Sequence, residues 1–494
     1  MQNKLQKLLC LPYCFIICIL ASCTKIEIPK PLPTPEAMGE LVIAIREAPG
    51  FYQQEGTTLS GFEYDLCNLF AASLGVKARF VAAKDFNQIN SLLTSHKVHM
   101  AASLPAGRTN FQFSQPIRSV GQWIVSHDDA LGPNDITELS GKTVAIVAGS
   151  PLAISLHALD EKFRPTVIEI PGIDEITLLA QVAAQKIPLA AVHDINFDLA
   201  SNFYPELNAR VRLPGMTDLR WAFSSDQITP EANPMHKQTG DQTQNPSLPS
   251  LPLRADAFIK RAHADGTLAR LHDRYFGHVK RVNSIGITQF IEDTHKLLPP
   301  LRRHFYAAQD LTGIDWRLLA ALSYHESRWN PLATSPTNVR GIMMLTEETA
   351  DHLGVDNRLD PASSIRGGAR YLAELNDQLP DSVKPPDRLW LALAAYNLGM
   401  GHLRGALAIA KDMHRDPNSW YEMKKVLPLL SRPEVYDHLK SGPARGGEAV
   451  ILVENIRTYY NILKRFEPPH IAPFPAASPF FITAPQAAGQ VTLR

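Results

Sequence analysis

The hydrophobic pattern of the chain changes once, near Val282, and this change limits the possible folds more than any other feature. Between residues 40 and 280, short apolar runs such as LVIAIRE and KTVAIVA alternate with stretches of helical periodicity. This alternation predicts α/β structure with parallel sheets. From residue 284 to 465 the periodicity is helical throughout. We therefore predict a multidomain chain, with an α/β domain over residues 40–280 and an all-α domain over residues 281–466.

Residues 1–22 have the features of a bacterial signal peptide. Lys4 and Lys7 precede an apolar run of about 14 residues, which is too short to span a bilayer comfortably. The run ends in Leu-Ala-Ser before Cys23, which resembles the lipobox of bacterial lipoproteins and implies lipid attachment at Cys23. Thr24 stands where an aspartate would retain such a lipoprotein at the inner membrane, so we expect the periplasmic face of the outer membrane. The alternative is a cysteine that follows an ordinary cleavage site by coincidence.

Three further stretches have the composition of linkers. Residues 23–39 are proline-rich and predict a semi-rigid tether, residues 225–254 predict a mobile surface loop, and residues 467–494 predict a disordered tail. Cys67 is the single cysteine of the body that follows, so an internal disulfide is excluded. The formal net charge of +0 gives no reason to expect a nucleic-acid partner or electrostatic binding to a membrane.

Several polar residues of the first domain could bind a zwitterion. Gly149-Ser150 leads into a predicted helix, whose free N–H groups can receive a carboxylate, and Arg108 can bind one through two hydrogen bonds. Asp194 follows a buried strand and could hold an ammonium group. An amino acid or a peptide end would satisfy all three. The alternatives are a surface arginine at position 108, a helix N-cap at Ser150 and a turn residue at Asp194.

The order of motifs over residues 40–280 resembles the bacterial type-3 solute-binding proteins of the periplasm. The motifs are GFEYDL, ASLPAGRTNFQFSQP, GKTVAIVAGSP, AAVHD and DGTLARLHDRYFG. The resemblance implies two α/β lobes with an amino acid or a wall-derived peptide bound between them. No nucleophile with a neighbouring base stands out here, so we interpret this domain as a binding or sensing module.

The stretch DLTGIDWRLLAALSYHESRWNP is the clearest helix of the second domain, and Asn330-Pro331 predicts its end. Leu318, Leu322 and Glu326 are spaced i, i+4 and i+8, so the glutamate lies on the stripe that carries the leucines. A carboxylate at the end of an apolar stripe loses part of its hydration, which raises its pKa toward the range of a general acid. On spacing alone, the alternative of a solvated glutamate just past the buried stripe is the more common outcome.

Four motifs change the interpretation of Glu326. They are ESRWNP, VRGIMMLTEETA, RLDPASSIRGGARYLAEL and ALAAYNLGMGHL. In this order they resemble the goose-type lysozyme-like domain of bacterial lytic transglycosylases, over residues 300–465. The resemblance implies that Glu326 is the sole catalytic acid and base. It further implies substrate contacts by Ser335, Met344, Tyr396 and Asn397, with methionine at 344 where most of the wider family has glutamine.

The same resemblance implies the substrate and the product. The substrate is a peptidoglycan glycan strand, cleaved between N-acetylmuramic acid and N-acetylglucosamine with formation of 1,6-anhydromuramoyl ends. No second carboxylate has a comparable motif, since Glu347 and Glu348 belong to the first turn of the next predicted helix. We expect no metal or cofactor, because Trp329 occupies the second histidine position of the zinc motif HExxH that His325 begins. Two alternatives stay open, a hydrolytic muramidase and a non-enzymatic lipoprotein that binds peptides or amino acids.

Overall fold

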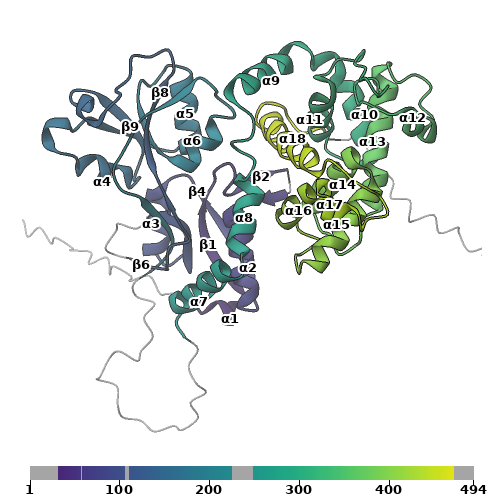
Figure 1. Cartoon of the computed structure of the whole chain (residues 1–494). Coiled ribbons are helices and arrows are strands. Elements are labelled where there is room, and N and C mark those ends of the chain that lie inside the picture. Colours follow the sequence, from purple (N-terminus) through teal and green to yellow (C-terminus); the bar gives the residue numbers. More distant parts are fainter. Residues whose placement is uncertain (1–31, 57, 106–110, 225–248, 472–494) are drawn as a thin grey trace, which may run out of the picture.

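The computed structural model describes residues 32–56, 58–105, 111–224 and 249–471. An α/β domain is followed by a helical domain, and the chain passes from one to the other between α8 (Thr267–Phe276) and α9 (Ser284–Lys296) (Figure 1). The predicted fold class is therefore confirmed. The described residues do not include the predicted signal peptide, Cys23, Arg108, most of the predicted loop (225–248) and most of the predicted tail (472–494).

The first lobe of the α/β domain is built on a six-stranded sheet. Its members in sheet order are β4 (Lys77–Ala83), β1 (Glu40–Arg46), β5 (Met100–Pro105), β13 (Thr217–Ser224) and β6 (Phe111–Phe113), with β7 (Arg118–Val120) also paired to β13. β1 is parallel to β4 and β5, whereas β13 is antiparallel to its neighbours. Residues 41–45 of β1 are all buried, as expected for a central strand, and α2 (Phe62–Ser73) and α3 (Phe86–Thr94) pack against it.

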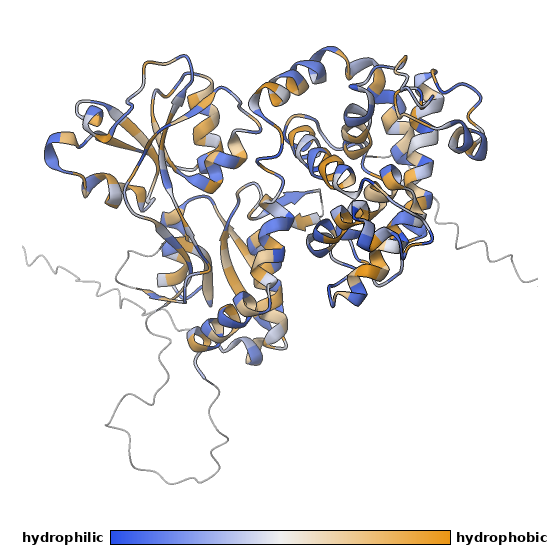
Figure 2. Ribbon diagram, in the orientation of Figure 1, coloured by the Kyte–Doolittle hydropathy of each residue, from blue (hydrophilic) through white to orange (hydrophobic). Residues whose placement is uncertain are grey.

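The second lobe has a five-stranded sheet. Its strands in order are β10 (Thr166–Ile170), β9 (Thr143–Val147), β11 (Ala190–His193), β8 (Gln122–His127) and β12 (Leu207–Arg212). Its helices are α4 (Leu152–His157), α5 (Glu175–Ala183) and α6 (Asp194–Ala200). β9 is parallel to β10 and β11, but β8 is antiparallel to β11 and β12. Both sheets are largely hydrophobic in Figure 2.

The prediction of parallel sheets is right for the strands that alternate with helices and wrong for the others. The chain crosses between the lobes twice, at Gly121 between β7 and β8 and at residues 213–216 between β12 and β13. The strands that enter and leave a lobe run back along it, so they pair antiparallel. No helix lies between these strands in the sequence, so the alternation of strands and helices cannot predict their direction.

The described residues after 248 complete the α/β domain with two helices, α7 (Leu251–Ala264) and α8. Gly266 separates them with a φ of 76°, a left-handed conformation that favours glycine. α7 begins at Leu251, inside the last residues of the predicted mobile loop, because Pro252 occupies the first turn of a helix that buries Ala255 and Phe258.

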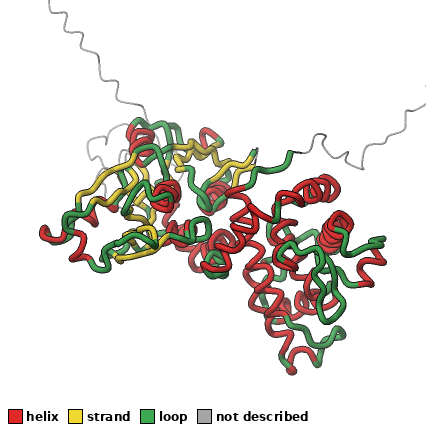
Figure 3. Tube along the Cα trace, turned by 90° about the horizontal axis from the view of Figure 1, so that it is seen from above, coloured by secondary structure: helices red, strands yellow, loops and turns green. Residues whose placement is uncertain are grey.

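The second domain consists of helices around a central pair, α11 (Trp316–Ser327) and α18 (Gly446–Phe466), which pack against each other. The surrounding helices are α9, α10 (Arg302–Thr312), α12 (Glu347–Leu353), α13 (Pro361–Asp377), α14 (Asp387–Leu398), α15 (Met400–Asp412), α16 (Trp420–Val426) and α17 (Pro433–Tyr436). Figure 3 shows this helical half beside the mixed half. Within the described ranges, no helix is long and apolar enough to cross a membrane.

The first residues of the predicted tail pack onto the helical domain. The Trp316 indole N–H donates to the carbonyl oxygen of Pro468 at 3.2 Å, and Gln309 donates to that of His470 at 2.8 Å. The His470 ring stacks on Tyr306 with centroids 4.4 Å apart. The Pro/Ala-rich composition that predicted disorder therefore does not apply to residues 467–471, where specific contacts hold the backbone.

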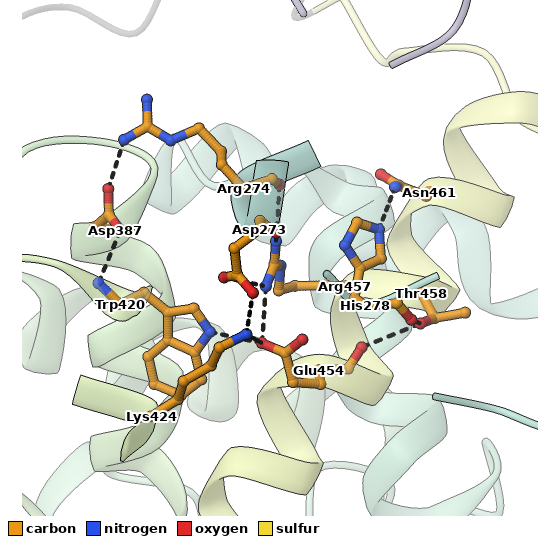
Figure 4. A network of polar contacts seen from close by, with 10 residues as sticks. All are labelled: Asp273, Arg274, His278, Asp387, Trp420, Lys424, Glu454, Arg457, Thr458 and Asn461. Carbon is orange, nitrogen blue, oxygen red and sulfur yellow. Dashed lines mark hydrogen bonds and ion pairs between the residues drawn. The ribbon is translucent and has the colours of Figure 1, made fainter. Parts of the chain in front are cut away.

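The two domains meet through a buried ionic network (Figure 4). Asp273 of α8 pairs with Lys424 of α16, and Lys424 also lies 3.8 Å from Glu454 of α18. The Arg457 guanidinium donates to Glu454 at 2.7 Å and to the backbone carbonyl oxygen atoms of Asp273 and Arg274 at 2.8 and 2.7 Å. Buried charges of this kind are costly to leave unpaired, so the network holds α8 against the helical domain.

Candidate active site

Glu326 lies in the last turn of α11, the most buried helix of the second domain. Asp315 caps the start of the helix, and residues 316–324 are all buried. The helix ends one residue after Glu326, because Arg328 and Trp329 both adopt left-handed φ angles of 52° and 56°. The stop therefore comes before the predicted Asn330-Pro331. The Trp329 indole folds back under the helix and donates to the carbonyl oxygen of Ala320 at 2.9 Å.

Burial decides the protonation state of Glu326. It raises the pKa of the Glu326 carboxyl to about 7, with no opposing ion pair or hydrogen bond among the described residues. The neighbouring His325 is also buried, which lowers its pKa to about 4 and keeps the imidazole neutral. Glu326 therefore holds its proton close to neutral pH, as a general acid must.

The raised pKa predicts a pH-dependent cost of Glu326 to stability. The pKa of this carboxyl is higher in the folded protein than in the unfolded chain, so ionisation disfavours the folded state. The free energy of unfolding therefore decreases as the pH rises from about 4.5 to 7. Glu326→Gln should raise the free energy of unfolding at pH 8 by about 2–3 kcal/mol, with the gain disappearing near pH 4. Urea unfolding of both proteins across this range measures the difference. A gain that does not vary with pH would contradict the assignment, and Glu348→Gln, at an exposed position, is the control.

The GIMM turn lies against the end of α11 and is held by three hydroxyl groups. Ser323 and Ser327 of α11 both donate to the carbonyl oxygen of Ile342, at 3.0 and 2.8 Å. The Tyr396 hydroxyl of α14 donates to the carbonyl oxygen of Met343 at 2.8 Å. The turn is thereby fixed between the helix that carries Glu326 and the helix that carries Tyr396. Sequence reasoning missed the two serines, although a serine within an apolar helix is a signal for a buried acceptor.

Tyr396 is brought close to Glu326. Its pKa is raised well above the usual value, first by burial and then by the charge of Glu326. Its ring also packs on Tyr371 of α13, with centroids 5.3 Å apart. The phenol stays protonated, and its proton is donated to the carbonyl oxygen of Met343, so Tyr396 fixes the GIMM turn within reach of the charge of Glu326.

The other predicted substrate residues lie around the turn. Met344 is half-buried with a left-handed φ of 48°, an uncommon conformation for this residue type. Ser335 accepts from the N–H of Val339 at 3.1 Å and contacts the Thr337 hydroxyl at 3.0 Å, so its hydroxyl is used within its own loop rather than on Glu326. Asn397 is exposed next to Tyr396. Within the described ranges, no cluster of His, Cys, Asp and Glu could hold a metal ion.

A small cavity lies between the two lobes of the first domain. Its lining is mainly apolar and includes Ala48, Phe51 and Phe86. Its polar lining residues are Arg46, Glu63, Ser103, His193 and Asn196. Of the predicted ligand residues, neither Ser150 nor Asp194 is in the lining, and Arg108 lies outside the described residues.

Ser150 and Asp194 have other partners. The Ser150 hydroxyl accepts from the N–H of Leu152 at 3.4 Å just before α4, whose N-cap residue is Pro151. Asp194 accepts from the N–H of Gly121 at 2.9 Å, at the crossing between the lobes. Its Oδ1 atom is buried without a hydrogen-bond partner among the described residues, so the ligand role of Asp194 stays a prediction.

Two charged groups of the cavity escaped sequence reasoning. The Arg46 guanidinium lies over the Phe86 ring at 4.3 Å, and its Nη1 atom is buried without a hydrogen-bond partner. Glu63 is 2% exposed, and burial raises its pKa to about 7 against the opposing hydrogen bonds from Ser103 and Trp221. The charge of Arg46 is partly balanced by Glu175 and Asp174, but its unpartnered Nη1 atom suits the carboxylate of a ligand.

Known proteins are similar to both domains. Residues 41–278 match the bacterial extracellular solute-binding proteins, family 3, and residues 303–418 match the transglycosylase SLT domain. The membrane-bound lytic murein transglycosylase F of Methylobacillus flagellatus is 40% identical over 472 residues, which are 94% of this chain and 95% of that protein. The protein of the same name from Nitrosospira multiformis is 39% identical and covers 92% of each chain.

Among solved structures, an arginine-binding protein mutant from T. maritima aligns with 49% of this chain and 97% of its own, with 17% identity and a TM-score of 0.40. The sequence matches extend over nearly the full length of both partners and over both domains in the same order. The chain belongs to the membrane-bound lytic murein transglycosylase F family.

Proposed function

We propose that this protein is a peptidoglycan lytic transglycosylase. The observation that carries the proposal is a single half-buried carboxyl, Glu326, whose pKa is raised to about 7 by desolvation and whose charge raises the pKa of Tyr396. Glycosidases that add water use two carboxyl groups. Among the described residues, no second carboxyl influences the pKa of Glu326. The names of the full-length relatives agree with this activity.

In the first step, the protonated Glu326 donates its proton to the glycosidic oxygen between N-acetylmuramic acid and N-acetylglucosamine. The bond breaks, and the 2-acetamido group of the muramoyl residue stabilises the positive charge at its C1 atom. To stabilise the carboxylate that this leaves, the Tyr396 hydroxyl must turn its proton away from the carbonyl oxygen of Met343, its acceptor in this structure. The 2-acetamido group of the substrate thus takes the place of a second carboxyl in this step.

In the second step, the Glu326 carboxylate takes the proton of the muramoyl 6-hydroxyl. The oxygen attacks C1, which closes the 1,6-anhydro ring and returns the proton to Glu326. Water is not consumed, so the reaction is an elimination rather than a hydrolysis. A carboxyl with a pKa of about 7 can act in both directions, because neither protonation state is strongly favoured at neutral pH.

The nature of the new chain ends tests this proposal. Mass spectrometry of fragments released from purified sacculi should show 1,6-anhydromuramoyl ends, which are lighter than reducing ends by one water molecule. Reducing ends as the main product would instead favour a hydrolytic muramidase. Sacculi incubated without protein are the control for pre-existing ends. An absence of any release would leave only the peptide-binding alternative.

We also propose that the chain is lipid-anchored through Cys23 at the periplasmic face of the outer membrane. The support is the lipobox-like sequence and Thr24 after it. In this position the enzyme reaches the peptidoglycan layer from the membrane. Cys23→Ala should release the protein into the soluble periplasmic fraction.

For the first domain we propose an amino acid or a wall-derived peptide as ligand of the cavity between the lobes. The support is the mainly apolar lining with the unpartnered Nη1 atom of Arg46. The loop that lines this cavity with Ala48 and Phe51 continues into the hairpin β2 (Gln53–Glu55) and β3 (Thr58–Ser60). Glu55 of the hairpin pairs with Arg317 of α11 at 2.5 Å and with Lys464 of α18 at 3.4 Å. The cavity is therefore connected to the helix of Glu326, and we propose that its ligand regulates lysis.

Glu55→Gln tests this connection. The substitution removes the negative charge that faces the buried Arg317, and with it the only ion pair between the hairpin and α11 among the described residues. The change in lysis rate that wall peptides cause should therefore become at least threefold smaller. The rate of sacculus lysis is measured with and without peptides from digested sacculi. Glu47→Gln, at an exposed position of the same loop, should keep the full peptide effect. Equal peptide effects in both variants, or none in the unmodified protein, would contradict regulation by this route.

A further inference from the structure

A second cavity, with a volume of about 400 Å³, lies between the two domains. Its walls come from α2 and α8 on one side and from α14, α16 and α18 on the other. Asp387 and Trp390 in its wall begin α14, whereas Tyr396 is near the end of that helix, roughly 13 Å further along. The cavity shares no lining residue with the cavity between the lobes. It is therefore separate from both sites described above.

Part of the charge in the cavity wall is already neutralised. Arg274 donates to Asp387 at 2.8 Å (Figure 4). It also donates to Asp65 of α2 at 3.3 Å. Arg457 is bound to Glu454 and to backbone carbonyl oxygen atoms, and Asp273 pairs with Lys424. These groups form the ionic network that joins the domains. They leave no charge free for a ligand.

Two cationic groups of the lining, one from each domain, form no ion pair among the described residues, although the charge of Arg270 helps to lower the pKa of the Asp265 carboxyl. The Arg270 guanidinium of α8 donates only to neutral acceptors, the carbonyl oxygen of Asp265 and the hydroxyl of Thr267, both at 2.9 Å. Lys384 lies in the loop before α14, and its ammonium group forms no ion pair or hydrogen bond within the described part of the chain. Arg270 is half-buried and Lys384 is exposed, so an anion that enters the cavity can reach one cationic group from each domain.

Neutral hydrogen-bond donors of the lining also favour an anionic ligand. Neither the Trp390 indole N–H nor the Tyr421 hydroxyl has a hydrogen-bond partner among the described residues, and both side chains line the cavity. Asp416 is the lining carboxylate without a cationic partner there, and it accepts from the N–H of Asn418 at 2.9 Å. Donors thus exceed acceptors, while Asp416 disfavours a compact, doubly charged anion such as phosphate.

We propose that this cavity binds a small dicarboxylate that bridges Arg270 and Lys384. Two separated carboxylates can each form charge-assisted hydrogen bonds, one with the planar guanidinium and one with the ammonium group. The volume is within the range of cavities that hold small molecules. Because the ligand contacts both domains, its binding stabilises the docked arrangement.

Isothermal titration calorimetry of the full chain tests the proposal with glutarate, acetate and inorganic phosphate. Glutarate should bind at least tenfold more tightly than acetate or phosphate. The double variant Arg270→Gln/Lys384→Gln should weaken glutarate binding at least tenfold. The matched control is Arg261→Gln/Lys411→Gln, which removes one exposed cation from each domain outside the cavity and should leave binding unchanged.

Three results would overturn the proposal: undetectable glutarate binding, equal weakening in the control variant, and tighter binding of phosphate than of glutarate. Arg46→Gln shows whether glutarate binds instead in the cavity between the lobes. Loss of glutarate binding in Arg46→Gln, together with normal binding in Arg270→Gln/Lys384→Gln, would also overturn the proposal. Thermal melting of each variant checks folding. The test does not depend on the proposed enzymatic function, since Glu326→Gln should bind glutarate as the unmodified protein does.

Discussion

Replacing Glu326 by glutamine should lower the rate of sacculus lysis at least about 1,000-fold. In the proposed reaction the same carboxyl donates a proton to the leaving oxygen and then removes one from the muramoyl hydroxyl, and an amide can do neither. General acid–base steps contribute about 100- to 10,000-fold each, so a residue that performs two of them has an effect at the upper end of this range. Release of soluble fragments from sacculi measures the rate.

The structure makes this variant a clean test. Glutamine has nearly the shape of glutamic acid, and Glu326 has no ion pair or hydrogen bond among the described residues that the substitution would break. The variant should therefore fold and melt at or above the temperature of the unmodified protein at neutral pH. Glu348→Gln on the exposed first turn of α12 should retain full activity. Lysis by Glu326→Gln at more than a few per cent of the normal rate would contradict the assignment of Glu326 as the catalytic group.

How far the sequence predicts this site is shown by Glu326 itself. The helix, the leucine stripe and the position of the glutamate on it follow from spacing. Its burial does not, because the groups that enclose the end of α11 come from elsewhere: Trp329 folds back beneath the helix, and the GIMM turn lies against it. The ordered motifs indicated the role, and tertiary contacts supply the pKa that the role requires.

The first domain shows the opposite case. The motifs predicted two lobes, and the structure has them. The polar residues that line the cavity, however, occupy sequence positions where such residues commonly have a purely structural role. Glu63 is in the first turn of α2, where acids usually favour the helix dipole, and Arg46 ends a buried strand. Glu63 is enclosed by Ser103 of β5 and Trp221 of β13, which lie far from it in the sequence, and spacing along one chain segment carries no information about such contacts.

The contacts between domains were also beyond sequence reasoning. Arg317 begins an apolar helix and is 2% exposed, with Glu55 of the other domain as one of its partners. A single arginine in such a position usually extends to solvent. Only the arrangement of the two domains reveals that a charge on the helix of Glu326 is neutralised by a hairpin of the first domain.

Substitution of Gly341 by alanine should have the largest effect on stability, a loss of about 3 kcal/mol or more in the free energy of unfolding. Gly341 has a φ of 83°, and an added Cβ atom would lie 1.8 Å from the carbonyl oxygen of Arg358. Backbone cannot yield as a flexible side chain does, so the turn must shift. The bonds to the carbonyl oxygen atoms of Ile342 and Met343 would be disturbed, and lysis should fall as well.

Gly354→Ala provides the matched control for the close contact. Gly354 ends α12 in the same domain with a φ of 66°, but an added Cβ atom would meet nothing within 4 Å. Both variants carry the cost of a left-handed alanine, about 1 kcal/mol, and only Gly341→Ala adds a clash with backbone. Urea unfolding of the two variants separates these contributions. Similar losses in both would mean that the turn adapts freely, and then the GIMM turn could not be the rigid support for Glu326 and Tyr396 that its hydrogen bonds indicate.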